Sequence, residues 1–159
     1  MKSKLCYGLM LAVLLASAPA VAQVSDTDML QQLRAEIQTD RQALVAANLG
    51  LSDAEGEAFW PIYRQYRAEM GAVGDRMQKL ITDYAEVWEA PTDDQAGAMV
   101  DELMAIRKQD LKVRKSYIKK FRKVLPETKV ARFVQLENKI DAIISYGLAD
   151  AIPLVGTSG

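Results

Sequence analysis

The chain contains no histidine, and its single cysteine, Cys6, lies close to the N-terminus. Nucleophilic catalysis of the Ser-His or Cys-His kind needs an imidazole base, so composition excludes it. The same absences remove the commonest ligands of zinc and copper. We therefore expect no catalytic residues, no cofactor and no metal site.

The N-terminus has the layout of a secretory signal peptide. Lys2 and Lys4 precede an apolar run from Leu9 to Ala18, and Ala20 to Ala22 form a small-x-small cleavage site. We expect a signal peptide over residues 1–22, cleaved after Ala22, and no stable membrane anchor afterwards. An uncleaved anchor is the alternative, because residues 5–24 carry no charge and are just long enough to span a bilayer.

Without residues 1–22 the chain has neither cysteine nor histidine, so an exported protein would be stabilised by packing alone. Loss of Lys2 and Lys4 changes the net charge from −1 to −3. This balance gives no reason to expect nucleic-acid binding. A thioether site for Cu(I) stays open, but most of the methionines fall on apolar helix faces and are better explained as core; the five are Met29, Met70, Met77, Met99 and Met104.

Proline and glycine are scarce and stand at the joints of a sequence that otherwise follows helical periodicity, with no alternation of period two. A first helix is predicted from Ser25 or Asp26 to Asn48, ended by Gly50. Its inward face is predicted to carry Leu30, Leu33, Ile37, Leu44 and Ala47.

Two capping boxes start the next helices. Ser52 with Glu55 begins the second, and Thr92 with Gln95 begins the third. The second helix has apolar residues spaced by four and three without a break, as on the contact face of a coiled coil: Phe59, Tyr63, Tyr66, Met70, Val73, Met77, Leu80, Tyr84 and Val87. A face that long needs a partner helix of similar length.

That partner is the third helix, predicted over residues 93–124, with Met99, Leu103, Ile106, Val113, Tyr117, Phe121 and Val124 facing inward. The short connection predicts an antiparallel hairpin. A fourth helix follows Pro126 up to Gly147, with Val130, Phe133, Leu136, Ile140 and Ile143 inward. The fold class is therefore all-α: four helices with a long hairpin, a helical domain over 23–148 and a tail over 149–159 that is apolar enough to dock.

Charge is segregated along this hairpin. Asp83 to Glu102 holds seven acidic residues and no basic one, whereas Arg107 to Lys123 holds nine basic residues and only Asp110. A solvated helix surface explains the solubility of both segments. The segregation itself favours a second interpretation, in which two copies pair head to tail as a two-fold dimer.

One short stretch resembles a known motif. Leu51 to Glu55 (LSDAE), between a first helix and a long second one, resembles the L-T-x-x-Q motif of the Spy/CpxP family of small exported helical proteins. The family repeats this motif near its last helix, where Leu125 to Phe133 (LPETKVARF) stands. In the first copy Ser52 and Glu55 keep the capping chemistry. In the second, Pro126 and Lys129 replace the capping residues, so no capping box can form.

The resemblance implies a periplasmic, non-enzymatic helical protein, usually a curved antiparallel homodimer. Members act as ATP-independent chaperones for unfolded or envelope proteins, as stress modulators that bind the periplasmic domain of a sensor kinase, or as metal-responsive sensors. The metal-responsive branch uses histidine, which this chain lacks. A basic surface with apolar patches is implied for client binding, and the candidate protein-binding residues are Trp60, Arg114, Lys115, Lys119, Arg122 and Lys123.

Trp60 and Pro61 are not explained by the apolar face of the second helix. Pro61 removes the hydrogen bond to the carbonyl of Glu57, which predicts a bend there. The burial of Trp60 decides between two interpretations. An exposed indole beside the basic residues would favour a contact surface, and a buried one would make the stretch structural.

Overall fold

The computed structural model describes residues 40–156. Within this range the chain is all-α, with four helical segments and no strand: residues 40–49, α2 (Asp53–Ala85), α3 (Asp93–Phe121) and α4 (Glu127–Ala151). The predicted signal peptide, Met29 and the inward residues Leu30, Leu33 and Ile37 lie outside the described residues. None of the helices in the described range is long and apolar enough to cross a membrane.

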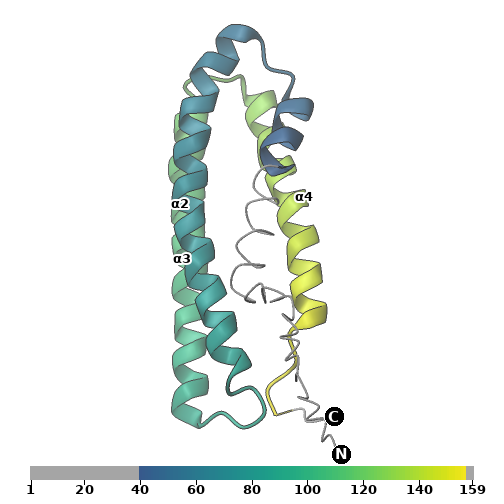
Figure 1. Ribbon diagram of the computed structural model, residues 1–159. Coiled ribbons are helices and arrows are strands. Elements are labelled where there is room, and N and C mark those ends of the chain that lie inside the picture. The colour runs from purple at the N-terminus through teal and green to yellow at the C-terminus, as the bar shows by residue number, and fades with distance from the viewer. Residues whose placement is uncertain (1–39, 157–159) are drawn as a thin grey trace, which may run out of the picture. The chain divides into compact units, whose positions relative to one another are not determined.

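The predicted hairpin is confirmed. Figure 1 shows α2 and α3 packed side by side along their length, with α4 returning beside them. Both capping boxes are formed. Glu55 N donates to Ser52 Oγ at 3.4 Å while Ser52 N donates to Glu55 Oε2 at 2.7 Å. Thr92 and Gln95 exchange the equivalent bonds at 2.9 and 3.2 Å.

The other helix ends are largely as the sequence predicts. Gly50 follows the first helical segment with a φ of 60°, a conformation that favours glycine. Pro126 precedes α4 without a side-chain cap, as its chemistry requires. α2 is continuous through Pro61, whose side chain is exposed. The fourth helix is predicted to end at Gly147, but α4 continues through this glycine, which keeps a negative φ, to Ala151.

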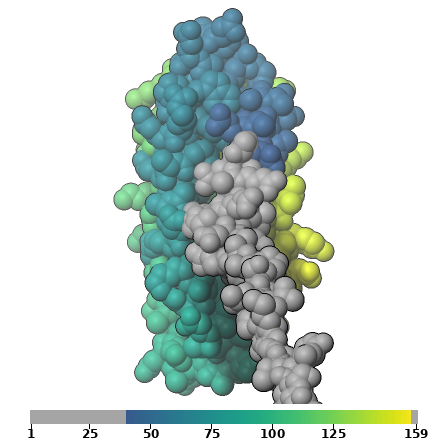
Figure 2. Space-filling model, in the orientation of Figure 1, coloured from purple at the N-terminus to yellow at the C-terminus, as the bar shows by residue number. Residues whose placement is uncertain are grey.

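An aromatic cluster forms the core at the end of the hairpin where α2 begins and α3 finishes. Its rings come from three helices, with the closest centroids, those of Phe121 and Phe133, 4.7 Å apart; the members are Phe59, Tyr63, Tyr66, Tyr117, Phe121 and Phe133. Val45 and Leu49 from the first helical segment complete it. In the space-filling view this segment lies against the first turns of α2 (Figure 2).

The predicted inward face of the first helical segment is rotated, whereas that of α4 is confirmed at Val130 and Phe133 and wrong at Ile143. Leu44 is 47 % exposed and Ala47 is exposed, while Arg41, Val45 and Leu49 are buried. On α4, Ile143 is 74 % exposed and Glu137 is buried. The predictions placed only apolar residues inside. In the structure Arg41 and Glu137 are both buried, and their opposite charges compensate each other.

The C-terminal tail docks against the turn between α2 and α3. The hydroxyl of Tyr84 donates to the carbonyl of Pro153 at 2.7 Å. The amide of Gly156 donates to the carbonyl of Trp88 at 2.9 Å. These two hydrogen bonds tie the described part of the tail to the turn end of the hairpin.

Candidate functional site

A row of lysines runs along the exposed surface of α3. These are Lys108, Lys112, Lys115 and Lys119, and their spacing of four, three and four residues places them on one side of the helix. They surround Leu111, which is 51 % exposed, in a shallow hollow lined by Lys108, Leu111, Lys112, Lys115, Ser116 and Lys119. We call these six residues the lysine face. Within the described residues no carboxylate forms an ion pair with its four lysines.

The structure distributes the predicted protein-binding residues over several places. Lys115 and Lys119 belong to the lysine face. Arg114 instead pairs with Asp110 on its own helix and with Asp141 of α4, each at 2.8 Å. Arg122 pairs with Glu127 at 3.0 Å. Lys123 is exposed near the end of α3.

Trp60 lies apart from the lysine face. Its indole packs edge-on against Phe59 and Tyr63, with ring centroids 5.1 and 5.5 Å away, and is half-buried. It also lines a shallow hollow beside Pro61 and Arg64. The residue thus supports the aromatic cluster with one side of its ring and contributes to the surface with the other.

A buried polar network joins the four helical segments. Glu137 is 2 % exposed, and its Oε2 accepts from Arg41 Nη1 at 2.9 Å, from the hydroxyl of Tyr66 at 3.0 Å and from Arg67 Nη1 at 3.4 Å. The other terminal nitrogen of Arg41 donates to Asp141 at 2.7 Å. Asp141 extends the network to Arg114 of α3.

Burial and charge act on these groups in opposite directions. Burial alone would lower the pKa of Arg41, but the carboxylates of Glu137 and Asp141 raise this pKa above its ordinary value. Burial, with a smaller contribution from Glu137, raises the pKa of Tyr63 to about 12. The pKa of Tyr66 rises for the same reasons. Arg41, Tyr63 and Tyr66 therefore keep one protonation state across the physiological range.

The network is incompletely satisfied. Glu137 Oε1, Arg41 Nε and the hydroxyl of Tyr63 are buried without a hydrogen-bond partner in the described part of the chain. An unpaired buried polar atom costs free energy because it has lost its hydrogen bonds to water. The network therefore carries a cost that an apolar core at the same place would avoid.

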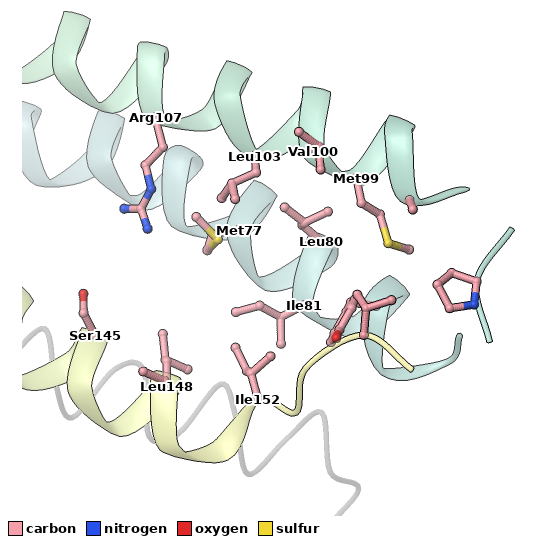
Figure 3. A pocket seen from close by; sticks show the side chains of 15 residues that line it. Met77, Leu80, Ile81, Met99, Val100, Leu103, Arg107, Ser145, Leu148 and Ile152 are labelled. Atoms are coloured by element: carbon pink, nitrogen blue, oxygen red, sulfur yellow. The ribbon is translucent and has the colours of Figure 1, made fainter. Parts of the chain in front are cut away.

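An apolar cavity of about 420 Å³ lies at the turn end of the hairpin, between α2, α3 and the last turns of α4. Figure 3 shows its walls: Met77, Leu80 and Ile81 from α2, Met99, Val100 and Leu103 from α3, and Ser145, Leu148 and Ile152 from the α4 side, with Arg107 at one end. α4 contributes the exposed side chains of Ser145 and Ala149 to the wall of this cavity. These small side chains do not fill the space between the helices.

Sequence reasoning missed this cavity. It identified Met77, Leu80, Met99 and Leu103 as core, on the assumption that two helices with matching apolar faces close against each other. The small residues at the end of α4 are the signal that was available.

The described residues contain no group of three or more carboxylate, histidine or cysteine side chains that could hold a metal ion. Of the methionines weighed for a thioether site, Met77 and Met99 line the cavity, Met70 packs on the core and Met104 is exposed. Comparisons with protein-family models, with curated proteins and with solved structures found no match.

Proposed function

We propose that this is a periplasmic, non-enzymatic protein of the Spy/CpxP type that binds unfolded or envelope proteins reversibly, as an ATP-independent chaperone or an envelope-stress accessory. The observation that supports the proposal is the lysine face of α3. Its four lysines have no carboxylate partner within the described residues, and Leu111 stands exposed among them.

The chemistry of such a surface suits weak, general binding. Uncompensated cations attract acidic segments over a Debye length of about 10 Å at 0.1 M salt. Leu111 and the methylene stems of the lysines then offer apolar contact of low specificity. Because long-range attraction raises the association rate more than the affinity, a client would be captured quickly and released readily.

The test is suppression of aggregation. Light scattering by an acidic client, reduced α-lactalbumin, would be followed at low ionic strength with equimolar exported protein. We expect scattering to fall severalfold, and the protection to weaken as salt is added. The double variant Lys115→Glu/Lys119→Glu should lose most of the protection.

The matched control is Arg132→Glu/Lys139→Glu, which changes the net charge equally at two exposed positions of α4, away from the lysine face. It should protect as well as the unchanged protein. If the unchanged protein leaves scattering unaltered at low salt, the proposed function is wrong. If both variants lose protection equally, net charge is responsible and the lysine face is not the site.

A further inference from the structure

The apolar cavity at the turn end is a second binding feature, separate from the lysine face. The two share no lining residue. Among the described side chains that line the cavity there is one charge, the guanidinium of Arg107, and no carboxylate. The other polar groups are Ser145 and Tyr84, and the hydroxyl of Tyr84 is already engaged with Pro153.

Arg107 lies at the boundary between the apolar cavity and a more polar hollow beside it. It lines the cavity and also the adjoining hollow, and Met77, Ser145 and Leu148 are shared in the same way. Figure 3 shows the guanidinium of Arg107 directed from α3 toward α4, with the hydroxyl of Ser145 facing it across the opening.

Within residues 40–156, the neighbouring arginines of that hollow form ion pairs and Arg107 does not. Arg41 and Arg67 pair with Glu137, and Arg114 pairs with Asp110 and Asp141. No residue of the described range pairs with Arg107. An unpaired guanidinium, which prefers carboxylate geometry, therefore lies at the polar end of an otherwise apolar cavity.

We propose that this cavity binds a long-chain carboxylate, a single-chain amphiphile whose acyl chain lies among Met77, Leu80, Leu103 and Ile152 while its head group pairs with Arg107. A cavity of about 420 Å³ falls at the lower end of the range that holds one small ligand. That size selects one acyl chain over the two chains of a phospholipid. Val100, Leu148 and Val155 line the cavity and are exposed, so the ligand has access from solvent.

The experiment measures displacement of the fluorescent fatty acid cis-parinarate from the exported protein by laurate, below the micelle concentration. We expect saturable binding with one site per chain. Arg107→Gln should weaken laurate binding roughly two- to fivefold, the effect of losing one exposed charge pair. Lys108→Gln, the adjacent exposed cation of the lysine face, is the matched control and should bind as the unchanged protein does.

Three further comparisons test where the acyl chain lies, which charge the head group needs, and whether the lysine face takes part. Ala149→Phe places a large ring at the cavity wall and should abolish binding, with circular dichroism confirming that the helices are retained. Dodecylammonium, which has a similar chain and the opposite charge, should displace the probe more weakly than laurate. The double variant Lys115→Glu/Lys119→Glu should still take up laurate, which would separate this site from the proposed client surface.

The outcomes that overturn the proposal are distinct. Absence of laurate binding removes the site. Equal affinity for laurate and dodecylammonium, or no effect of Arg107→Gln, removes the assignment of the head group. Binding to anionic phospholipid vesicles without uptake of free laurate would show a membrane-surface interaction instead.

Discussion

Lys129, near the start of α4, contacts the residues that precede and begin α2. Its Nζ lies 2.5 Å from Glu55 Oε2 and donates to the carbonyl of Gly50 at 2.7 Å. Glu55 therefore accepts from the Ser52 amide and from Lys129 with the same oxygen. Before α4, where Pro126 and Lys129 form no capping box, Lys129 instead supports the capping box before α2.

This contact predicts a pH dependence of stability. The hydrogen bond from Lys129, followed by the backbone bond from Ser52, lowers the pKa of Glu55 from 4.5 to about 2. A carboxyl whose pKa is lower in the folded state contributes stability above its unfolded pKa, and this contribution is lost as pH falls toward the folded pKa. We expect Glu55→Gln to lower the melting temperature at pH 7 and to differ little from the unchanged protein near pH 2.

Thermal unfolding followed by circular dichroism at pH 7, 4.5, 3 and 2 measures this difference. Glu57→Gln, at an exposed position on the same turn of α2, is the control and should leave the profile unchanged. A difference between Glu55→Gln and the unchanged protein that stays constant from pH 7 to 2 would contradict the prediction.

The buried pair of Arg41 and Glu137 predicts strong coupling between the two residues. Arg41→Met leaves Glu137 short of one cation, and Glu137→Leu leaves Arg41 with Asp141 alone. Each change should lower the free energy of unfolding by about 3 kcal/mol, because each leaves a buried charge poorly compensated. The double variant should cost clearly less than the two single changes together, since neither charge is then buried.

Urea denaturation of the four proteins gives this cycle directly. Arg76→Met is a suitable control, since Arg76 pairs with Glu102 on a surface where both side chains are about 40 % exposed. It should cost less than about 1 kcal/mol. Additive effects of Arg41→Met and Glu137→Leu would mean that the pair does not interact as the geometry indicates.

Local chemistry decides which parts of the fold can be predicted from the sequence. Capping boxes and glycine ends are local chemistry, so the starts of α2 and α3 and the end of the first helical segment follow from a few adjacent residues. The hairpin follows from a short connection between two long apolar faces.

The inward positions of residues 40–49 and of the later turns of α4, by contrast, do not follow from local chemistry. Arg41 and Glu137 are 96 positions apart, and either charge is inward only because the other is. No local pattern contains that information. The cavity escapes prediction for a related reason: it depends on which side of α4 meets the hairpin, where Ser145 lines the cavity while Ile143, two positions earlier, is 74 % exposed.

Two neighbouring tyrosines on α2 should respond oppositely to loss of the hydroxyl. Tyr66 donates to Glu137 at 3.0 Å, whereas the hydroxyl of Tyr63 is buried without a partner in the described chain. Tyr66→Phe should lower the free energy of unfolding by about 2 kcal/mol, as expected for a hydrogen bond to a charged group. Tyr63→Phe removes an unsatisfied group and should leave stability unchanged or raise it by up to about 1 kcal/mol.

Each tyrosine variant is the matched control for the other, since both remove one oxygen from a ring in the same cluster. The measurement is again the free energy of unfolding in urea. Equal destabilisation by Tyr63→Phe and Tyr66→Phe would show that the Tyr63 hydroxyl has a partner and that the network is larger than described.

The docking of the tail predicts a local effect of Tyr84. Tyr84→Phe removes the hydrogen bond to Pro153 and leaves the amide of Gly156 as the remaining tie between the tail and Trp88. One such bond contributes about 1 kcal/mol, so hydrogen exchange at the Gly156 amide should become roughly fivefold faster. Global stability should stay within about 0.5 kcal/mol, because the tail opens without the helices.

Exchange followed by NMR separates the two effects, and Tyr146→Phe, at a tyrosine that is 80 % exposed on α4, is the control that should change neither. If Gly156 exchanges at the same rate in the Tyr84 variant, the Tyr84 hydroxyl does not hold the tail against the hairpin.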